Sequence, residues 1–428
     1  MPSLVPGMGL PGVSGPESAT WTESTATHPG FGTRAGDSLR PNFVVRWAFY
    51  LSVCTIPFSL LYVPGTGGHV GVLRVVQMLL LCGILSQPRV CLRLVPTALF
   101  WFASYIGLRM VWGFWFTPEM LHSWWANSRE FIEFLPWLWV MFNVLQFPDV
   151  RCGGLWALGL GCALCALFHI AGIGVAEVPD GLENRSSVFG VNANELGVTY
   201  ATAMIALLGL CMIRPRTPGQ LLVPFPLIAL IGVGLAKTGS RSAMLTFVIG
   251  VLVLLFFGKA FGSRLSRAAA FVMLGAVVAL ILWTIPTVLE RFDEINPGNI
   301  GLGNPRARMA PVLWEMFLRS PLYGRGPDSY QWELTRRAMP YLIKQGKLIV
   351  AHNLALLLLV ETGIIGFMLF YGGLVAAITA AWRARFKPCG PLPLALLLPF
   401  VMAGATVCNP SHYLVFWLAI AYALAGVA

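Results

Sequence analysis

The chain has 428 residues, of which 57% are hydrophobic and only 11% are charged, and its mean hydropathy is +0.73. An ordinary soluble domain carries roughly a quarter charged residues, so this composition excludes one. Apolar runs of about 18 residues or more recur along the chain and predict an all-α, polytopic helical membrane protein. The formal net charge of +11 indicates membrane topology and an interaction with membrane lipid rather than with nucleic acid.

The first 42 residues differ from the rest of the chain. They are rich in Gly, Pro, Ser and Thr and poor in large apolar residues, which is typical of a disordered tail. They lack the basic start, apolar stretch and cleavage site of a signal peptide. Residues 43–428 are expected to form one transmembrane domain of about twelve helices. The predicted spans are 43–63, 70–86, 92–115, 129–147, 154–175, 194–213, 221–238, 242–258, 267–289, 353–382, 391–408 and 410–427.

Basic residues in the short connections predict the orientation of these spans. Alternate connections, counted from the tail, hold fourteen Lys and Arg, whereas the intervening short connections hold four. Because cytoplasmic loops carry the excess of basic residues, we expect both termini in the cytoplasm. The long loop at about 290–351 is then outside, although it contains nine Lys and Arg. A basic loop in that place requires an anionic partner or a neighbour of opposite charge.

Four polar segments share the outer side in this topology, and each contains arginine or histidine. Arginine suits pyrophosphate because its planar fork is always charged and binds in a bidentate manner. A single arginine at an interface is explained equally well by snorkelling to lipid headgroups. Several basic sites on one face of so weakly charged a chain favour an anionic headgroup ligand. The segments are residues 184–197, 237–242, 304–308 together with 321–326, and 352–353.

His352 lies at the junction between a polar segment and an apolar run. The residues before it (PYLIKQGK) are polar and basic, and the residues after it (LALLLLV) are apolar. A histidine in this place either fixes the depth of a helix at the interface or moves a proton near neutral pH. The arginines on the same side of the membrane favour the second interpretation.

Arg74 and Arg109 fall inside predicted spans, each nearer the outer end. Charges within spans are expensive and usually functional. Each is therefore expected to line a cavity or to pair with Glu195, and snorkelling is the alternative.

Groups that hold metal ions are scarce in this sequence. Cys162, Cys165 and His169 could share one helix face at a metal-ligating spacing, but the site would lack a fourth ligand, and packing is the better interpretation. Glu177, Asp180 and Glu183 have the spacing of a solvated turn. No acidic pair presents itself for Mg²⁺, so neither a metal ion nor another cofactor is expected.

Four motifs in this order resemble the O-antigen ligase and polymerase family of bacterial inner-membrane glycosyltransferases. They are RSSVFGVNANELG, which begins at Arg185, TGSRSA, which contains Arg241, the arginines before PLYGRGPDSY, and AHNLALLLLVETGIIG, which contains His352. The resemblance covers about 184–373.

The resemblance implies glycan transfer from a polyprenyl (undecaprenyl) diphosphate carrier to a hydroxyl, on the periplasmic side and without a metal ion. The acceptor hydroxyl would belong to lipid A-core, to a growing glycan or to a protein, and the motifs do not separate these. The catalytic residues that it implies are His352, Arg241 and Arg306. Arg308 is the alternative to Arg306, because many members carry a tryptophan four residues after this arginine and Ala310 stands there.

The expected reaction is a direct displacement at the anomeric carbon, which inverts the configuration of this carbon. His352 is expected to take the hydroxyl proton, and the arginines to neutralise the leaving diphosphate. The long loop would close over the carrier, with Gly324, Gly326 and Gly346 as hinges. Further substrate-binding residues are expected to be Arg185, Arg308, Arg325, Asn353, Arg74 and Arg109.

Two other classes of protein fit the composition. A lipid-glycan transporter or flippase also has many spans and buried arginines, but it would show internal repeats and charges through the depth of the membrane. A structural membrane scaffold would leave the basic loop unexplained.

Overall fold

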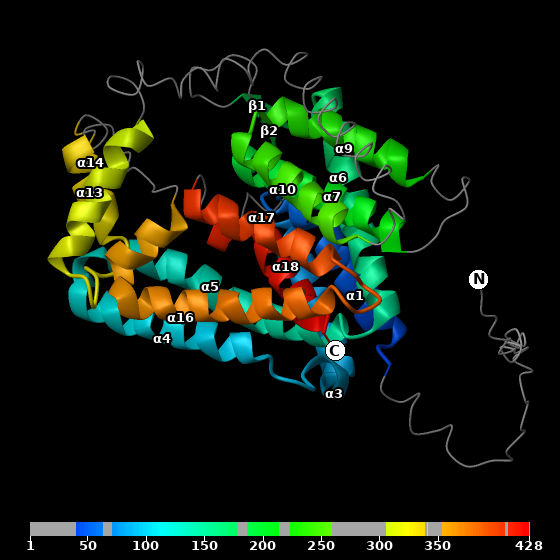
Figure 1. Cartoon of the computed structure of the whole chain (residues 1–428), viewed down its shortest axis with the longest axis horizontal. Helices are drawn as coiled ribbons and strands as arrows, with labels where there is room; N and C mark the ends of the chain where they lie inside the picture. The colour runs from blue at the N-terminus through cyan, green and yellow to red at the C-terminus, as the bar shows by residue number, and fades with distance from the viewer. Residues whose placement is uncertain are drawn as a thin grey trace, which may run out of the picture. The chain divides into compact units, whose positions relative to one another are not determined.

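The computed structural model describes residues 40–62, 71–177, 186–213, 223–258, 305–338, 340, 353–406 and 410–427. Its regular structure there is helical apart from two strands of three residues each, β1 and β2, which pair antiparallel (Figure 1). The predicted helical class is thus confirmed. The elements in order are α1 (Phe43–Cys54), η2 (Ile56–Phe58), α2 (Val72–Ser86), α3 (Pro88–Cys91), α4 (Thr97–Phe116), η3 (Pro118–Met120), α5 (Leu121–Val144), α6 (Pro148–Ala171), β1 (Val175–Glu177), β2 (Ser186–Val188), α7 (Ala193–Ile213), α9 (Pro224–Thr238), α10 (Arg241–Phe257), α13 (Pro305–Arg319), α14 (Ser329–Ala338), α16 (Leu354–Ala384), α17 (Leu392–Thr406), η4 (Pro410–His412) and α18 (Leu414–Ala425).

Among the described residues, three helices are long and apolar enough to cross a membrane, namely α6, α7 and α16, and shorter apolar helices accompany them. Each predicted span within the described ranges coincides with a helix. The predicted span 267–289, the tail up to residue 39 and, within the long loop, residues 290–304, 339 and 341–351 lie outside the described residues. The total of twelve spans therefore stays a prediction.

Two helix boundaries differ from the predicted ones. The first helix, α1, ends at Cys54 instead of residue 63, because Pro57 lacks an N–H and the chain continues there as the 3₁₀ turn η2. Helix α5 begins at Leu121 instead of residue 129. The predicted boundary lies where the apolar run starts, so it leaves out the first turns of α5. These turns carry polar side chains that face a pocket inside the protein.

Helix α7 contacts α6, α9, α10 and α17, and almost every face of it is buried (Figure 1). Small residues in its sequence let the neighbouring helices approach closely. A Cβ on Gly197 would lie 2.8 Å from Thr238 Oγ1 and 3.0 Å from Ser240 Cβ. The start of α7 therefore packs directly on the turn between α9 and α10, which brings two of the predicted outer segments together.

Helix α16 is broken at Gly363, where the sequence pattern predicts one continuous span. The backbone of Gly363 has φ 65° and ψ −166°, a region that is essentially restricted to glycine. The break interrupts the helical hydrogen bonds on both sides of this residue. Backbone groups that lose their helical partners must find others, because burying them unpaired is costly.

A turn from the long loop before α16 supplies those partners. We call residues 320–326 the docking turn. It receives two N–H groups of α16 and donates two of its own, so the broken backbone is satisfied at each of these four positions. The hydrogen bonds run from Arg325 N to Val360 O (2.8 Å), from Gly326 N to Glu361 O (2.9 Å), from Ile364 N to Pro321 O (2.9 Å) and from Ile365 N to Leu322 O (3.4 Å).

The glycines of the docking turn serve this contact. Gly324 and Gly326 have φ 72° and 89°, and a Cβ on Gly324 would lie 2.5 Å from the carbonyl carbon of Glu361. In the structure these two glycines allow close packing, and their expected role as hinges stays a prediction. Gly346 lies outside the described residues.

Replacing Gly363 by alanine is expected to lower the free energy of unfolding by about 1–3 kcal/mol, the usual cost of forcing a side chain into such backbone angles. A Cβ there would also overlap the carbonyl of Leu322. The matched control is Gly107→Ala in the interior of α4, where a Cβ meets nothing within 4 Å. This change should be neutral or stabilising by up to about 1 kcal/mol. Denaturant unfolding in detergent measures both, and equal effects would refute the docking role of Gly363.

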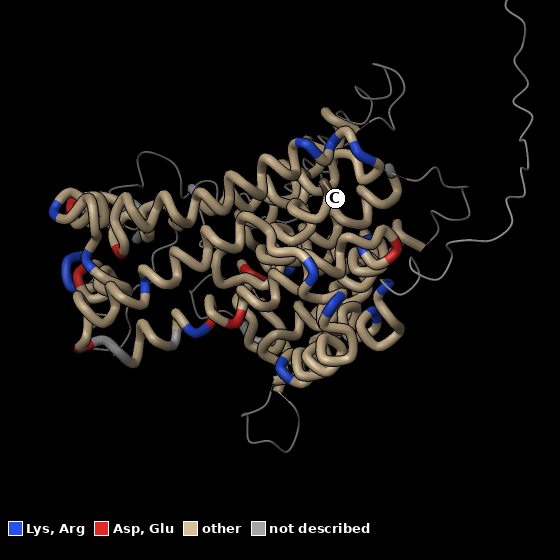
Figure 2. Tube along the Cα trace, turned by 90° about the horizontal axis from the view of Figure 1, so that it is seen from below, with Lys and Arg blue, Asp and Glu red and all other residues tan. Residues whose placement is uncertain are grey.

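Charged residues gather towards the two ends of the helical bundle (Figure 2). The end near the C-terminus is mostly basic, and there Arg151 donates to the carbonyl of Ala425 (2.9 Å). The opposite end, formed by α13 and α14, mixes basic and acidic residues. These two ends are the ones that the count of basic residues assigns to the inner and outer sides.

Candidate functional site

Three charged side chains meet inside the protein, and we call them the buried ion cluster. Arg109 comes from α4, Glu361 from α16, and Asp328 from the residues before α14. The guanidinium pairs with the Glu361 carboxylate, and its Nη2 lies 3.5 Å from Asp328 Oδ1. All three side chains are at most 4% exposed. Two carboxylates face one guanidinium, so the cluster carries a formal charge of −1 when all three groups are ionised.

Neighbouring polar groups form hydrogen bonds with the remaining donors and acceptors of the cluster. Nε of the guanidinium donates to Ser128 Oγ (3.2 Å), while Asp328 Oδ2 accepts from Ser123 Oγ (2.7 Å) and Asn127 Nδ2 (2.8 Å). The N–H of Asp328 donates to Glu361 Oε1 (2.9 Å). Buried charges are tolerated only when they are paired and hydrogen-bonded in this manner. The cluster therefore joins α4, α5, α16 and the residues that follow the docking turn.

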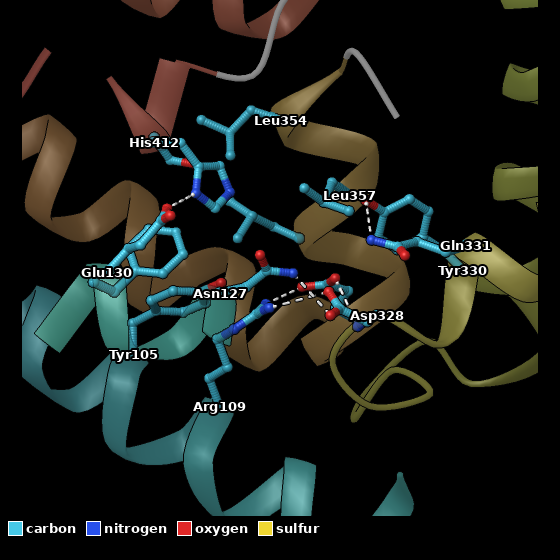
Figure 3. A pocket seen from close by; sticks show the side chains of 14 residues that line it. Tyr105, Arg109, Asn127, Glu130, Asp328, Tyr330, Gln331, Leu354, Leu357 and His412 are labelled. Atoms are coloured by element: carbon cyan, nitrogen blue, oxygen red, sulfur yellow. Dashed lines mark hydrogen bonds and ion pairs between the residues drawn. The ribbon is translucent and has the colours of Figure 1, made fainter. Parts of the chain in front are cut away.

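A cavity of about 280 Å³ lies beside the buried ion cluster, and we call it the polar pocket (Figure 3). It is bounded by α4, α5, the start of α14, the first turns of α16 and η4. Leucines of α16 form one apolar side. The other polar side chains that line it are Asn127, Glu130, Gln331, Ser411 and His412.

His412 and Glu130 form a pair in the wall of this pocket. Nδ1 of His412 lies 2.8 Å from Glu130 Oε2, and the imidazole packs against Phe131 with 5.2 Å between ring centroids. The second ring nitrogen lies on the side away from Glu130 (Figure 3). A carboxylate at one nitrogen fixes the orientation of the ring and directs the other nitrogen to a ligand or solvent.

A second polar region lies where α7 and α10 begin. Ser240 caps the N-terminus of α10, and its hydroxyl donates to Asn194 Oδ1 (3.0 Å). Arg241 is the first residue of α10 and is half-buried. A helix N-terminus with a cation in its first turn attracts anions.

Comparison with known proteins gives two matches. Residues 226–371 match the family model described as O-antigen ligase. The chain is also 25% identical, over 360 residues, to an O-antigen ligase of Pseudomonas aeruginosa, an alignment that covers 80% of this chain and 81% of that protein. The chain is thus similar to O-antigen ligases over most of its length. Together with the apolar helices, this similarity indicates a membrane protein.

The O-antigen ligase match covers α9, α10, α13, α14 and the first half of α16. Two of the residues that the sequence singled out lie outside the described residues, namely His352 and Arg185. Arg306 and Arg308 lie in the first turn of α13, but their side chains are not among those that the structure describes. The roles of these four residues stay predictions.

Arg241 and Asn353 lie at helix N-termini. The Asn353 side chain caps α16 by accepting from Leu356 N (3.0 Å). Arg74, by contrast, is exposed in the first turn of α2 and is not among the residues that line the polar pocket. The contacts with substrate that the sequence predicts for Arg241, Asn353 and Arg74 also stay predictions.

Arg109 lines the polar pocket, as expected of a charge within a span. Its partners differ from the expected one. It pairs with Glu361 and Asp328 instead of Glu195, because the break in α16 and the docking turn bring these two carboxylates to it.

The basic charge of the long loop before α16 is partly neutralised by the loop's own acidic residues. Arg337 pairs with Glu315 (2.6 Å) and Glu333 (2.5 Å), and Arg336 also pairs with Glu333 (3.1 Å). Burial opposes the charged form of Glu333, but Arg337 and Arg336 outweigh it and hold the pKa of Glu333 below its usual value. Arg325 differs, because its Nη1 is buried and has no hydrogen-bond partner among the described residues. That unmet donor suits an anionic ligand.

The cysteines pack as expected. Cys162 and Cys165 are buried on α6, and their sulfurs face the carbonyls of Thr199 and Pro57. Within the described part of the chain, no group of three or more His, Cys, Asp and Glu residues is arranged to hold a metal ion.

Four residues of the site were not found from the sequence: Glu361, Asp328, Glu130 and His412. Glu361 had a usable signal, since a lone carboxylate in the apolar run LLLLVETGIIG needs a buried partner. Asp328 and Glu130 stand among other polar residues in the sequence, which gives no signal that they are buried or functional. His412 follows Pro410 at a break between spans, where only the fold shows that it meets α5.

Proposed function

We propose that this protein transfers a glycan from a polyprenyl diphosphate carrier to a hydroxyl acceptor at the outer, periplasmic end of the bundle, as in O-antigen ligation or polysaccharide polymerisation. The observation that carries the proposal is a polar pocket at the start of α16 in a chain that is similar to O-antigen ligases. Leu354, which lines this pocket, follows His352 by two residues in the chain.

The donor diphosphate requires cations. Arg241 at the N-terminus of α10 and Arg325 with its unmet Nη1 support an anion site on this side of the bundle. Arg306 and Arg308 open α13, so two further guanidinium groups belong to the same basic loop. Fixed cations stabilise charge that develops on a leaving group.

The proposed step is a single displacement at the anomeric carbon. The acceptor oxygen forms a bond to this carbon while the bond from the carbon to the phosphate oxygen breaks. His352 takes the proton of the hydroxyl, and the diphosphate leaves with the bonding electron pair next to Arg241 and Arg306. Attack opposite to the leaving group inverts the configuration of the sugar carbon, and no metal ion takes part.

The experiment uses the full chain purified in detergent, with a lipid-diphosphate-linked glycan and a hydroxyl acceptor. We expect transfer without any sealed compartment, and we expect it to persist in excess chelator. A flippase would need a compartment and would form no new glycosidic bond, so the absence of product would refute the proposal. Loss of activity in chelator that Mg²⁺ or Mn²⁺ restores would refute the arginine-based mechanism.

A further inference from the structure

The charge of the polar pocket does not suit a diphosphate. Its ionisable lining comprises three carboxylates, Glu130, Asp328 and Glu361, against one guanidinium, Arg109. With His412 neutral, the formal charge of the lining is −2. Arg109 is already paired with two of these carboxylates, which neutralise its charge, so it cannot attract an anion. A diphosphate in this cavity would face like charges at short range, where repulsion is strong.

We propose that the polar pocket is the acceptor subsite and holds the sugar whose hydroxyl attacks the donor. This inference rests on the proposed function and names the substrate class of one half of the site. The donor diphosphate then belongs to the cationic region around Arg241, while a neutral or amino-substituted sugar occupies the acidic cavity.

The lining fits a polyol. A sugar hydroxyl both donates and accepts hydrogen bonds, and it meets both kinds of group here. Asn127 and Gln331 offer amides, Glu130 offers a carboxylate oxygen, and His412 offers its second ring nitrogen (Figure 3). The rings of Tyr105 and Phe131 and the leucines of α16 give apolar surface for the C–H faces of the sugar.

The volume limits how much of the acceptor enters. Pockets for small molecules measure roughly 300–1,000 Å³, and this one measures about 280 Å³. It therefore holds one sugar residue. The rest of a longer acceptor would lie outside, so the pocket selects the terminal residue that carries the nucleophilic hydroxyl.

The test compares two glutamates on one helix. Glu130 lines the pocket and contacts His412, whereas Glu133 is absent from the lining and pairs with Arg129 on an exposed surface. Both are about half exposed, so neither Glu130→Gln nor Glu133→Gln should disturb folding. His412→Gln removes the imidazole of the pair and serves as the second variant.

Two readouts separate the subsite from the function. The first is binding of uncharged methyl glycosides to the purified protein, measured by NMR without any donor. The second is the acceptor KM and the donor KM in the transfer assay. Loss of a charge-assisted hydrogen bond weakens binding by about one to two orders of magnitude. We therefore expect glycoside affinity to fall and acceptor KM to rise at least about tenfold for Glu130→Gln and His412→Gln, with donor KM and Glu133→Gln unchanged.

Inorganic pyrophosphate is the opposing probe. Its binding should fall for Arg241→Ala and stay constant for Glu130→Gln. Equal behaviour of Glu130→Gln and Glu133→Gln, or displacement of the glycoside by pyrophosphate, would overturn the subsite even if transfer is observed. Glycoside binding that depends on Glu130, in a protein that makes no product, would leave the subsite standing and refute the transferase.

Discussion

Replacing His352 by alanine is expected to lower the transfer rate by about 10²–10⁴-fold, the usual contribution of a general base. Binding of the polyprenyl diphosphate donor should remain within about twofold of the original, because a neutral imidazole adds little ground-state affinity for an anion. Titration with the donor and a transfer assay on the same preparation measure the two quantities.

The arginines should behave differently from the histidine. Arg241→Ala and Arg306→Ala remove charge-assisted contacts of about 1.5–3 kcal/mol, so donor affinity should fall by roughly one to two orders of magnitude together with turnover. Lysine at either position should rescue only partly, because the bidentate fork is lost. Arg308→Ala is the internal control, and it should be milder if Arg306 is the ligand.

Near-normal turnover in His352→Ala would make His352 an interfacial anchor. The sequence then leaves Glu177, Asp180, Glu183 and Glu195 as alternatives for the base. The structure adds His412, whose ring is already oriented by Glu130 in the wall of the polar pocket.

The largest expected effect on stability comes from the buried ion cluster. Arg109→Met should lower the free energy of unfolding by about 3–5 kcal/mol, since two carboxylates with at most 3% exposure lose their only cationic partner among the described residues. Denaturant unfolding in detergent measures the loss. Arg129→Met is the matched control on α5, because the Arg129–Glu133 pair is about half exposed and should contribute at most about 1 kcal/mol.

A rescue experiment separates charge from shape. Neutralising both carboxylates together with the arginine, in the triple variant of Arg109→Met, Asp328→Asn and Glu361→Gln, should recover much of the loss, because no buried charge is left uncompensated. A triple variant as unstable as Arg109→Met would show that the packing of the arginine, and not its charge, holds α4 to α16.

Helix positions could be predicted well because the apolar runs are long and interrupted by clear polar segments. Periodicity could not predict the break in α16, since GIIG reads as an apolar continuation and the reason for the break lies about 40 residues earlier in the docking turn. The same holds for Arg109. Its place inside a span indicated a buried partner, but a long-range contact decides which carboxylate it meets.

The arginines of the predicted outer segments could be identified as a group because they stand in short polar segments between long apolar runs. The acidic residues of the site could not be identified from the sequence, since Glu130 and Asp328 stand among ordinary polar residues. Only the fold, in which α5, α14 and η4 meet, shows that they line one pocket. The sequence therefore indicates the residues suited to the proposed donor but not those suited to the proposed acceptor.

The break at Gly363 also bears on how the chain assembles during synthesis. Residues 364–384 form a helix of 21 residues, about 31 Å long at 1.5 Å per residue, which is enough to cross the hydrocarbon layer alone. The nine residues before Gly363 are too short to do so, and their free backbone groups need protein around them. The docking turn leaves the ribosome before α16 does, because it precedes α16 in the chain. The partner of the broken helix is thus already made when the helix inserts, and the biosynthetic order matches the order in which these hydrogen bonds must form.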